Sequence, residues 1–210
     1  IVLKNNELAL LLIDFGADPT ILDKEGKSFL FYCISEEIKN ISVLQKVVLL
    51  GYDINSKNGQ NKTLLMESIN CYLHTPKDNV EIKNSHLEMI KELIHLGINV
   101  NALDNNNETL LFILVRHGNR ELLHLFLETN KMNLNYQNNQ DETPLLLMAL
   151  NGIKNADLIK LFLEKGANPD LKNQMGKSII EILVDIILYS ENKKPLEFEY
   201  EILLNEDAEY

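Results

Sequence analysis

The 210-residue sequence has little of what marks several specialised protein classes. It contains no Trp, two Cys, five Pro and nine Gly, so collagen and disulfide-rich scaffolds are excluded. Cys33 and Cys71 fit neither the paired spacing of a zinc site nor a disulfide framework. Both stand in apolar segments, which predicts buried thiols in a reducing compartment. The expected location is the cytoplasm, or the host cytosol if the protein is a secreted effector.

Long apolar runs and an excess of basic residues are also absent. The longest apolar segments, residues 8–13 and 179–188, fall short of the roughly 18 residues that a membrane-spanning helix needs. Acidic residues outnumber basic residues 31 to 20, which gives a net charge of -11. We therefore expect no membrane insertion and no binding to nucleic acid. With 45% hydrophobic and 24% charged residues, the composition is that of a globular protein.

Leu and Asn, with 38 and 26 residues, are abundant instead, and they follow an internal repeat. Five leucine-rich stretches end in a similar turn, at residues 16–20, 51–55, 97–101, 131–135 and 166–170. Eight residues after each turn stands a hydroxyl residue that opens another apolar run, at Ser28, Thr63, Thr109, Thr143 and Ser178. The periods between these hydroxyl residues are 35, 46, 34 and 35. The constant step indicates that the connection between units has a fixed geometry.

Each part of the repeat has a physical role. A hydroxyl residue before an apolar run is a typical helix N-cap, because its side chain accepts a hydrogen bond from a backbone N–H that the helix leaves unbonded. Ser178 followed by Glu181 matches the capping-box pattern. Glycine after a leucine-rich stretch suits the left-handed end of a helix. The eight-residue step is rich in Asn, Asp and Gly, which favour turns. Each unit is therefore predicted to contain a turn, a helix, a loop and a second helix.

These residues resemble the ankyrin repeat. Residues 143–145 (Thr-Pro-Leu) match the opening of the family's first helix, and residues 116–122 match its inter-helix segment. Residues 16–18 and 166–168 match its helix-end turn. The acid or amide that starts each unit stands at Asp23, Asn58, Asp104, Asn138 and Asn173. The repeats are divergent, since one unit alone keeps the proline and none keeps the histidine after the leucine. The resemblance implies an all-α repeat solenoid of ankyrin-type helix–loop–helix pairs with short β-hairpin or turn connections.

The repeat divides the chain into the units of one domain. We predict a partial repeat at 1–22, complete repeats at 23–57, 58–103, 104–137 and 138–172, a C-terminal capping repeat at 173–194 and an acidic tail at 195–210. Because the sequence opens inside a helix-like pattern, we expect it to be part of a longer protein. Stacked repeats share one core. Its expected residues are Leu8, Leu11, Leu12, Val47, Val48, Ile90, Leu93, Leu122, Leu123, Phe126, Ile159 and Phe162.

Two segments depart from the pattern. The third repeat holds about thirteen extra residues near 72–86, with the composition of a loop. They serve either as a partner contact or as tolerated surface length. After Pro195, apolar and acidic residues alternate, and residues 195–210 carry six acids and no base. This tail is either an irregular second cap helix or an extended strand that packs on the last repeat or pairs with another chain, so that 195–203 mediates self-association.

No residue pattern points to catalysis. The five histidines share no metal-ligand spacing. The segment 104–108 lacks the glycine and the final Glu of a calcium loop. Neither a phosphate-binding glycine loop nor a nucleophile elbow is present. We therefore expect no enzymatic activity, no catalytic residue, no cofactor and no metal site.

The ankyrin resemblance implies a non-enzymatic scaffold that binds another protein through its concave face and hairpin tips. Two alternatives stay open. One is a targeting or adaptor domain of a larger effector, enzyme or channel, and the other is an acidic inhibitor or immunity protein that blocks a basic toxin or nuclease. The family's contact positions, transferred residue by residue, give the expected partner-binding set: Lys24, Glu25, Lys27, Ser35, Glu36, Gln60, Lys62, Asn70, Asn105, Asn106, Glu108, Arg116, His117, Asn139, Gln140, Glu142 and Asn151.

Overall fold

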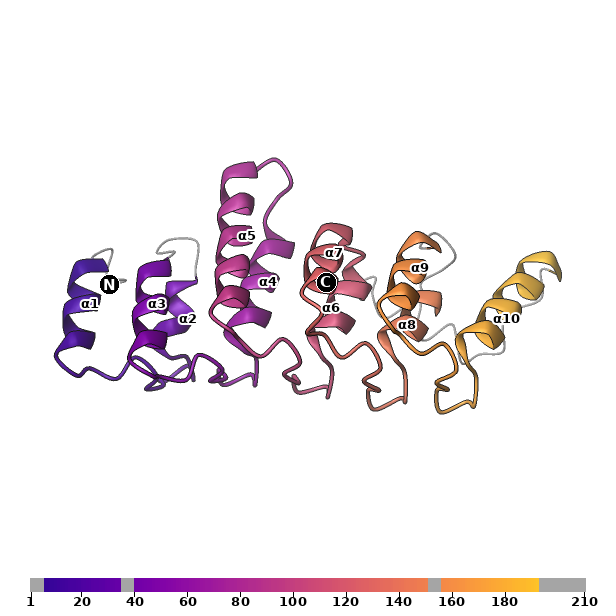
Figure 1. Cartoon of the computed structure of the whole chain (residues 1–210), viewed down its shortest axis with the longest axis horizontal. Coiled ribbons are helices and arrows are strands. Elements are labelled where there is room, and N and C mark those ends of the chain that lie inside the picture. The colour runs from indigo at the N-terminus through magenta and orange to yellow at the C-terminus, as the bar shows by residue number, and fades with distance from the viewer. Residues whose placement is uncertain (1–5, 35–39, 151–155, 193–210) are drawn as a thin grey trace. The chain divides into compact units, whose positions relative to one another are not determined.

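The computed structural model describes residues 6–34, 40–150 and 156–192, and these residues form ten helices joined by turns (Figure 1). The helices are α1 (Asn6–Asp14), α2 (Phe29–Cys33), α3 (Ile41–Leu49), α4 (Leu64–His74), α5 (Val80–His95), α6 (Leu110–His117), α7 (Arg120–Glu128), α8 (Pro144–Leu150), α9 (Ala156–Glu164) and α10 (Ile179–Asn192). Isolated antiparallel bridges join Leu22 to Ser28 and Lys57 to Thr63. The predicted all-α repeat fold of paired helices with short turn connections is confirmed.

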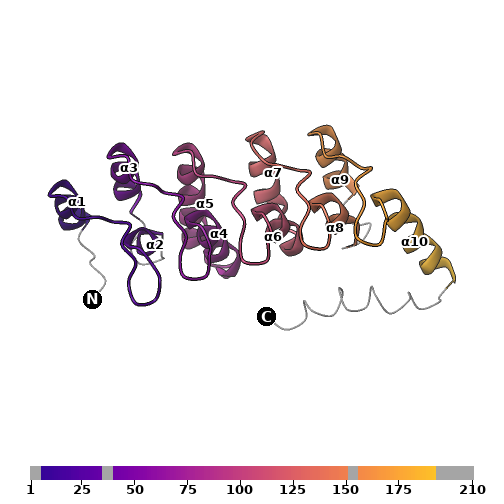
Figure 2. The same ribbon diagram turned by 90° about the horizontal axis from the view of Figure 1, so that it is seen from below.

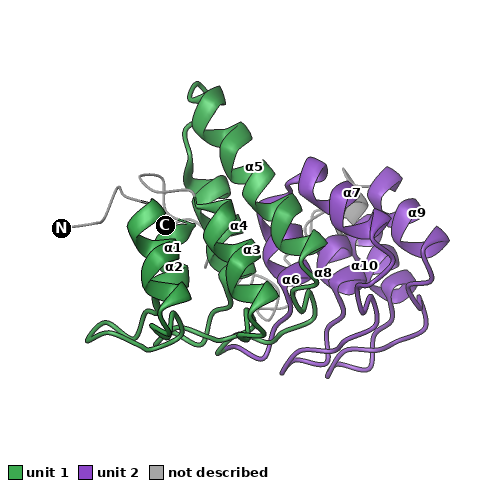
Figure 3. Cartoon of the chain, turned by 60° about the vertical axis from the view of Figure 1, so that its left-hand side comes forward, with its two compact units in different colours: residues 1–105 green, residues 106–210 purple. Residues whose placement is uncertain are grey.

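Two compact units divide the chain, residues 1–105 and residues 106–210 (Figure 3). In the first unit, α1 packs on α3, α2 packs on α3 and α4, and α4 packs on α5. In the second unit, α6 packs on α7 and α8, and α8 packs on α9 and α10. Within each unit, the first helices of successive repeats therefore form one row and the second helices form another (Figure 2). The helix α1 is a second helix, and the described residues include no first helix of its repeat.

Side chains cap many of the helix starts. Thr63 and Thr143, before first helices, and Asn40, Asn79 and Asn119, before second helices, accept a hydrogen bond from the backbone N–H three residues on. The Glu181 carboxylate accepts one from the Ser178 N–H at 2.6 Å, as the capping-box pattern predicts. Ser28 and Thr109 have the extended backbone of an N-cap but make no side-chain cap bond. Asparagine thus caps these second helices, whereas threonine caps these first helices.

Each second helix that the structure describes ends at a residue with a left-handed backbone. These residues are Gly16 (φ 91°), Gly51 (φ 83°), Gly97 (φ 84°), Asn130 (φ 53°) and Gly166 (φ 94°). After α1, the N–H of Gly16 donates to the Ile13 carbonyl and the N–H of Ala17 donates to the Leu12 carbonyl. This pattern satisfies carbonyls that the helix leaves unbonded. Asn130 fills the position in the repeat that lacks glycine, because asparagine tolerates the left-handed conformation better than most residues.

The extra residues of the third repeat lengthen its helices. The helix α4 has 11 residues and α5 has 16, whereas α3, α7 and α9 have 9 each. The prediction of a loop near 72–86 is therefore wrong, because residues 75–79 alone connect the two helices. The extension is packed: Tyr72 is 2% exposed, and the Lys83 ammonium lies 4.8 Å from its ring centre. In the first unit, α5 rises beyond α1 and α3 (Figure 1).

Most of the expected core residues are buried. These are Val47, Ile90, Leu93, Leu122, Leu123, Phe126 and Phe162, while Val48 and Ile159 are half-buried. In α1 the prediction is wrong for Leu8, Leu11 and Leu12, which are 37%, 51% and 47% exposed. A repeat cannot bury the apolar surface of its second helix without its first helix, and the described residues supply none for α1.

Several predictions lie outside the described residues. They concern Ser35, Glu36, Asn151, and the whole tail at 195–210 with its self-association segment 195–203. The repeat boundaries stay a prediction. In the described ranges, every helix is too short or too polar to cross a lipid bilayer.

Candidate functional site

The turns between successive helix pairs share one hydrogen-bonding pattern. The Asp23 carboxylate accepts hydrogen bonds from the backbone N–H groups of Glu25 (2.8 Å) and Lys27 (3.0 Å). The same two bonds, from residues two and four positions on, are made by Asn58, Asn138 and Asn173. Counted from the Asp or Asn that starts each turn, the fourth residue has a left-handed backbone. These fourth residues are Gly26, Asn61, Asn107, Asp141 and Gly176. This shared geometry needs a fixed number of residues, which explains the constant step of eight.

Side-chain amides join the tip of one turn to the next. In the first unit, the Asn105 side chain donates to the Gln60 carbonyl at 3.0 Å. In the second unit, the Asn139 side chain donates to the Asn106 carbonyl at 3.2 Å, and Gln174 donates to the Asn139 carbonyl at 2.6 Å. Asn105 and Asn139, predicted as partner contacts, therefore hold neighbouring turns together. The sequence carries a signal for this role, since an amide recurs at the second turn position in these three repeats.

A second row of amide bonds joins the turns that follow the second helices. The Asn55 side-chain oxygen accepts from the Asn99 N–H at 2.7 Å in the first unit. The Asn135 oxygen accepts from the Asn168 N–H at 2.7 Å in the second. The abundance of asparagine thus serves helix caps, left-handed turn positions and bonds between repeats.

Two predicted partner-binding residues, Glu108 and Glu142, are only 4% and 5% exposed. Both oxygens of Glu108 accept hydrogen bonds from the Arg116 guanidinium. The Asn138 amide donates to Glu108 at 3.2 Å and to Glu142 at 3.3 Å. Burial raises the pKa of Glu142, although the Asn138 hydrogen bond and the Arg116 charge act in the opposite direction. Both carboxylates are therefore buried and bonded within the turns, which leaves them little surface for a partner, and their role as partner contacts stays a prediction.

The other described residues of the predicted set lie at or near the surface. Exposed are Lys24, Glu25, Gln60, Asn105, Asn106, Arg116, His117, Asn139 and Gln140, and half-buried are Lys27, Lys62 and Asn70. We call Asn106, Arg116, His117, Asn139 and Gln140, all in the second unit, the recognition face. These side chains carry hydrogen-bond donors and acceptors, with no reactive pair among them.

Sequence reasoning missed Tyr32 at the first turn. Its hydroxyl donates to the Asp23 carboxylate at 2.5 Å, and this bond raises the pKa of Tyr32 to about 12. The same bond is the largest cause that lowers the pKa of Asp23. Tyr32 follows Asp23 by nine residues, so no local pattern predicts the contact. The pair fixes α2 to its turn.

The thiol of Cys33 lies buried in α2. Burial raises the pKa of the Cys33 thiol to about 12, so this thiol stays protonated at neutral pH and is a poor nucleophile. In the described ranges, no three His, Cys, Asp or Glu side chains lie close enough together to hold a metal ion.

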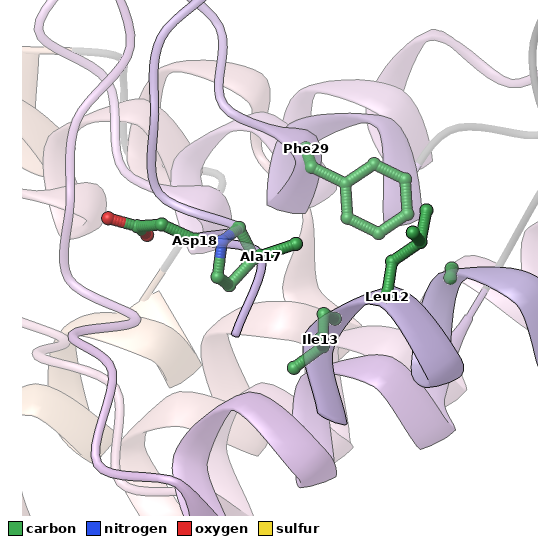
Figure 4. A pocket seen from close by; sticks show the side chains of 7 residues that line it. Leu12, Ile13, Ala17, Asp18 and Phe29 are labelled. Atoms are coloured by element: carbon green, nitrogen blue, oxygen red, sulfur yellow. The ribbon is translucent and has the colours of Figure 1, made fainter. Parts of the chain in front are cut away.

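An apolar cavity of about 160 Å³ lies at the end of the first unit (Figure 4). It is lined by Ala9, Leu12 and Ile13 of α1, by residues 17–19 of the following turn and by Phe29 of α2. Leu12 and Phe29 point toward one another across it (Figure 4). Sequence reasoning did not predict this cavity, because its walls come from two repeats.

Comparisons with known proteins agree with this architecture. The family profile for ankyrin repeats (3 copies) matches residues 79–173. An ankyrin repeat protein of Acanthamoeba polyphaga mimivirus is 27% identical over 183 residues, which is 87% of this chain and 21% of the viral protein. The chain thus spans about a fifth of that relative's length.

Two solved structures show the same fold. The ankyrin repeat domain of Bcl-3, a member of the IkappaB protein family, superposes with a TM-score of 0.66 at 19% identity, covering 88% of this chain and 77% of that one. A chain from the complex of a Bdellovibrio bacteriovorus predatory endopeptidase with an immunity protein gives a TM-score of 0.59 at 22% identity, covering 88% and 89%. Ankyrin repeats are generally protein–protein interaction modules and generally non-enzymatic. The repeated turn, the paired helices and these matches show that the chain carries ankyrin repeats, with the family profile matching residues 79–173.

Proposed function

We propose that this chain is a non-enzymatic scaffold that binds a partner protein through its turn tips and the adjacent first-helix surface. The observation that carries the proposal is the row of amide hydrogen bonds between successive turns, at 3.2 Å and 2.6 Å in the second unit. These bonds hold the tips in place before a partner arrives. Binding then costs little ordering of this chain, which leaves more of the contact energy for affinity.

The chemistry of the recognition face favours a polar partner surface. Asn106, Asn139 and Gln140 offer amide donors and acceptors, and the Arg116 charge is already engaged by Glu108. The first unit differs, because its exposed Lys24 and half-buried Lys62 are basic. We therefore propose a partner that meets the second unit through hydrogen bonds and the first unit through acidic side chains.

A matched pair of histidine variants tests the proposal. His117 stands at the end of the first helix α6 on the recognition face, and His124 stands on the second helix α7; both are exposed. The wild-type chain, His117→Glu and His124→Glu are each immobilised and incubated with an extract of the source organism. Captured proteins are then quantified by mass spectrometry.

We expect at least one protein that the wild type and His124→Glu capture equally and that His117→Glu captures about tenfold less, a change of about 1.4 kcal/mol in binding free energy. Circular dichroism should show that both variants remain folded. Equal capture by His117→Glu and His124→Glu, or greater loss with His124→Glu, would contradict the proposal.

Two more specific roles each have an observation in their favour. The adaptor role is favoured by the viral relative, of which this chain matches 21%. The inhibitor role is favoured by the net charge of -11 and by the similar chain from the endopeptidase–immunity protein complex. A basic enzyme whose activity falls on addition of stoichiometric chain would support the inhibitor role. A captured partner whose activity is unchanged would support the adaptor role.

A further inference from the structure

The turn at residues 58–62 contains an Asn–Gly pair. Among the residues that the structure describes, Asn58 is the one asparagine that glycine follows. At the equivalent turn position of a later repeat, Asn138 is followed by Asn139, whose side chain crowds the backbone nitrogen. Glycine leaves that nitrogen unhindered and its backbone mobile. Asn58 is therefore the described asparagine whose side chain the following backbone nitrogen attacks most readily once the turn is free to move.

The chemistry of this attack is the loss of ammonia from the asparagine side chain. After its proton is lost to hydroxide, the Gly59 nitrogen forms a bond to the Asn58 Cγ, and the Cγ–Nδ2 bond breaks. The leaving nitrogen takes a proton from water and departs as ammonia, which leaves a cyclic imide. Water then opens the imide: opening at Cγ gives aspartate, and opening at the backbone carbonyl carbon gives isoaspartate, whose main chain runs through Cγ. Nothing is oxidised or reduced, and the co-reactants are hydroxide and water.

The folded turn restrains both reacting groups. The Gly59 N–H donates to the Gly26 carbonyl at 2.7 Å, so its proton is shielded from hydroxide. The Asn58 side-chain oxygen accepts hydrogen bonds from two backbone N–H groups of its own turn, at 3.0 Å each. Asn58 is also 8% exposed. The attack therefore requires that the turn at 58–62 first separates from the turn at 23–27.

The contact between these turns is a close approach of two glycines. A Cβ on Gly26 would lie 2.7 Å from the Gly59 Cα and 2.9 Å from the Gly59 nitrogen. A Cβ on Gly59 would lie 3.2 Å from the Glu25 carbonyl oxygen. Glycine at position 59 thus permits the backbone contact between the turns and also creates the reactive pair with Asn58.

We propose that Asn58 is a site of spontaneous deamidation, which the contact between Gly26 and Gly59 protects and which separation of the two turns exposes. The aspartate product restores the turn, since the Asp23 carboxylate already makes the same two backbone bonds at 2.8 Å and 3.0 Å. Isoaspartate does not restore it, because its main chain is one carbon longer and its free carboxylate is attached directly to Cα. Conversion to isoaspartate therefore makes an opening of these turns irreversible.

Incubation of the full chain at mildly alkaline pH tests the proposal. Peptide mass spectrometry quantifies the conversion of Asn58, and methylation by an isoaspartyl methyltransferase distinguishes isoaspartate from aspartate. A synthetic peptide of residues 55–62 is the unprotected reference. Gly26→Ala opens the contact between the turns. Val47→Ala is the control, because Val47 is 0% exposed in the core of the same unit and its truncation leaves both glycines in place.

We expect Asn58 in the wild type to convert at least about tenfold more slowly than in the peptide, because the reaction needs a local opening. Gly26→Ala should convert about tenfold faster than the wild type, whereas Val47→Ala should stay close to it. The proposal is overturned if the wild type converts at the rate of the peptide, if Gly26→Ala folds and converts no faster, or if both variants accelerate conversion equally.

Two further measurements do not depend on the folding of Gly26→Ala. In the wild type, the Gly59 amide should exchange its hydrogen at least about tenfold more slowly than in the peptide, and an unprotected amide would overturn the proposal. The isoaspartate fraction, separated by ion-exchange chromatography, should have a lower Tm than Asn58→Asp, which carries the other product. Equal Tm values would overturn the irreversible opening.

Discussion

Arg116 donates hydrogen bonds from two guanidinium nitrogens to the two carboxylate oxygens of Glu108, eight residues earlier. Glu108 precedes the N-cap Thr109, and Arg116 lies in the last turn of α6. The pair therefore runs along about 10 Å of helix and fixes the helix to its turn. Since the Glu108 side chain is 5% exposed and the Arg116 side chain is 35% exposed, the pair is partly shielded from solvent.

Removing Arg116 alone should destabilise the chain, because a buried carboxylate would lose its cation. We expect Arg116→Ala to lower the free energy of unfolding by about 1–3 kcal/mol, with the partial exposure of arginine keeping the loss below that of a fully buried pair. The double variant Glu108→Gln with Arg116→Met should lose less, since no unpaired charge remains. Urea unfolding measures both. A double variant as unstable as Arg116→Ala would show that the pair's charges do not determine the effect.

Glu142 should make stability depend on pH. Its pKa is raised from the ordinary value of 4.5, chiefly by burial, so the folded chain holds this proton more tightly than the unfolded chain. The stabilisation is full below about pH 4.5 and is lost as pH rises through the folded pKa. Glu142→Gln stays neutral, so it should gain stability over the wild type as pH rises through that window. Glu121→Gln, at an exposed site, is the control. A difference in the free energy of unfolding between Glu142→Gln and the wild type that stays constant with pH would contradict this prediction.

Gly26 and Gly176 occupy the same turn position with the same φ of 71° but have different surroundings. A Cβ on Gly26 would lie 2.7 Å from the Gly59 Cα, whereas one on Gly176 would meet nothing within 4 Å. Gly176→Ala should cost about 1 kcal/mol, from the left-handed backbone alone. Gly26→Ala should cost about 1–3 kcal/mol more, because the Gly59 N–H bond to the Gly26 carbonyl (2.7 Å) must open. Equal losses in thermal unfolding would show that the close approach contributes nothing.

Deleting residues 75–84 should lower the Tm, whereas deleting a flexible surface loop would leave the Tm nearly unchanged. The deletion removes the first turn of α5 and with it Lys83, which lies over the Tyr72 ring. It also removes Thr75, which is 4% exposed. We expect a loss of about 2–4 kcal/mol in the free energy of unfolding. Val80→Ser, at a site 59% exposed, is the control and should change stability little. A deletion variant with the wild-type Tm would restore the interpretation as tolerated surface length.

Local chemistry made the fold predictable from sequence. The helix-end turn at Gly16 and the N-cap Thr63 act within a few residues, so their types and spacing disclose them. The eight-residue step is likewise local, because one Asx side chain and one left-handed residue define the turn. Local residue types also explain the wrong prediction for the third repeat. Thr75 and Pro76 indicate that a connection starts there, but they do not show that α5 begins at Val80.

The site was less predictable, because burial depends on neighbours that sequence does not place. Glu108 and Glu142 occupy turn positions where other repeats have lysine. Glu108 is bonded by Arg116 at the far end of α6 and by Asn138 from the next turn, and Asn138 also bonds Glu142 in its own turn. Leu12 fits the apolar pattern of a core residue, and its exposure follows from the lack of a first helix beside α1 in the described chain. Contacts between elements decide these outcomes.

Hydrogen exchange of the chain with and without its captured partner tests the central claim, binding through the turn tips and first-helix surface, most directly. In the second unit, the backbone amides of residues 106–107, 116–118 and 138–141 should exchange more slowly in the complex, while those exposed on α7 and α9 should keep their rates. Slowed exchange confined to α7 and α9, with the turns and the end of α6 unchanged, would contradict the account.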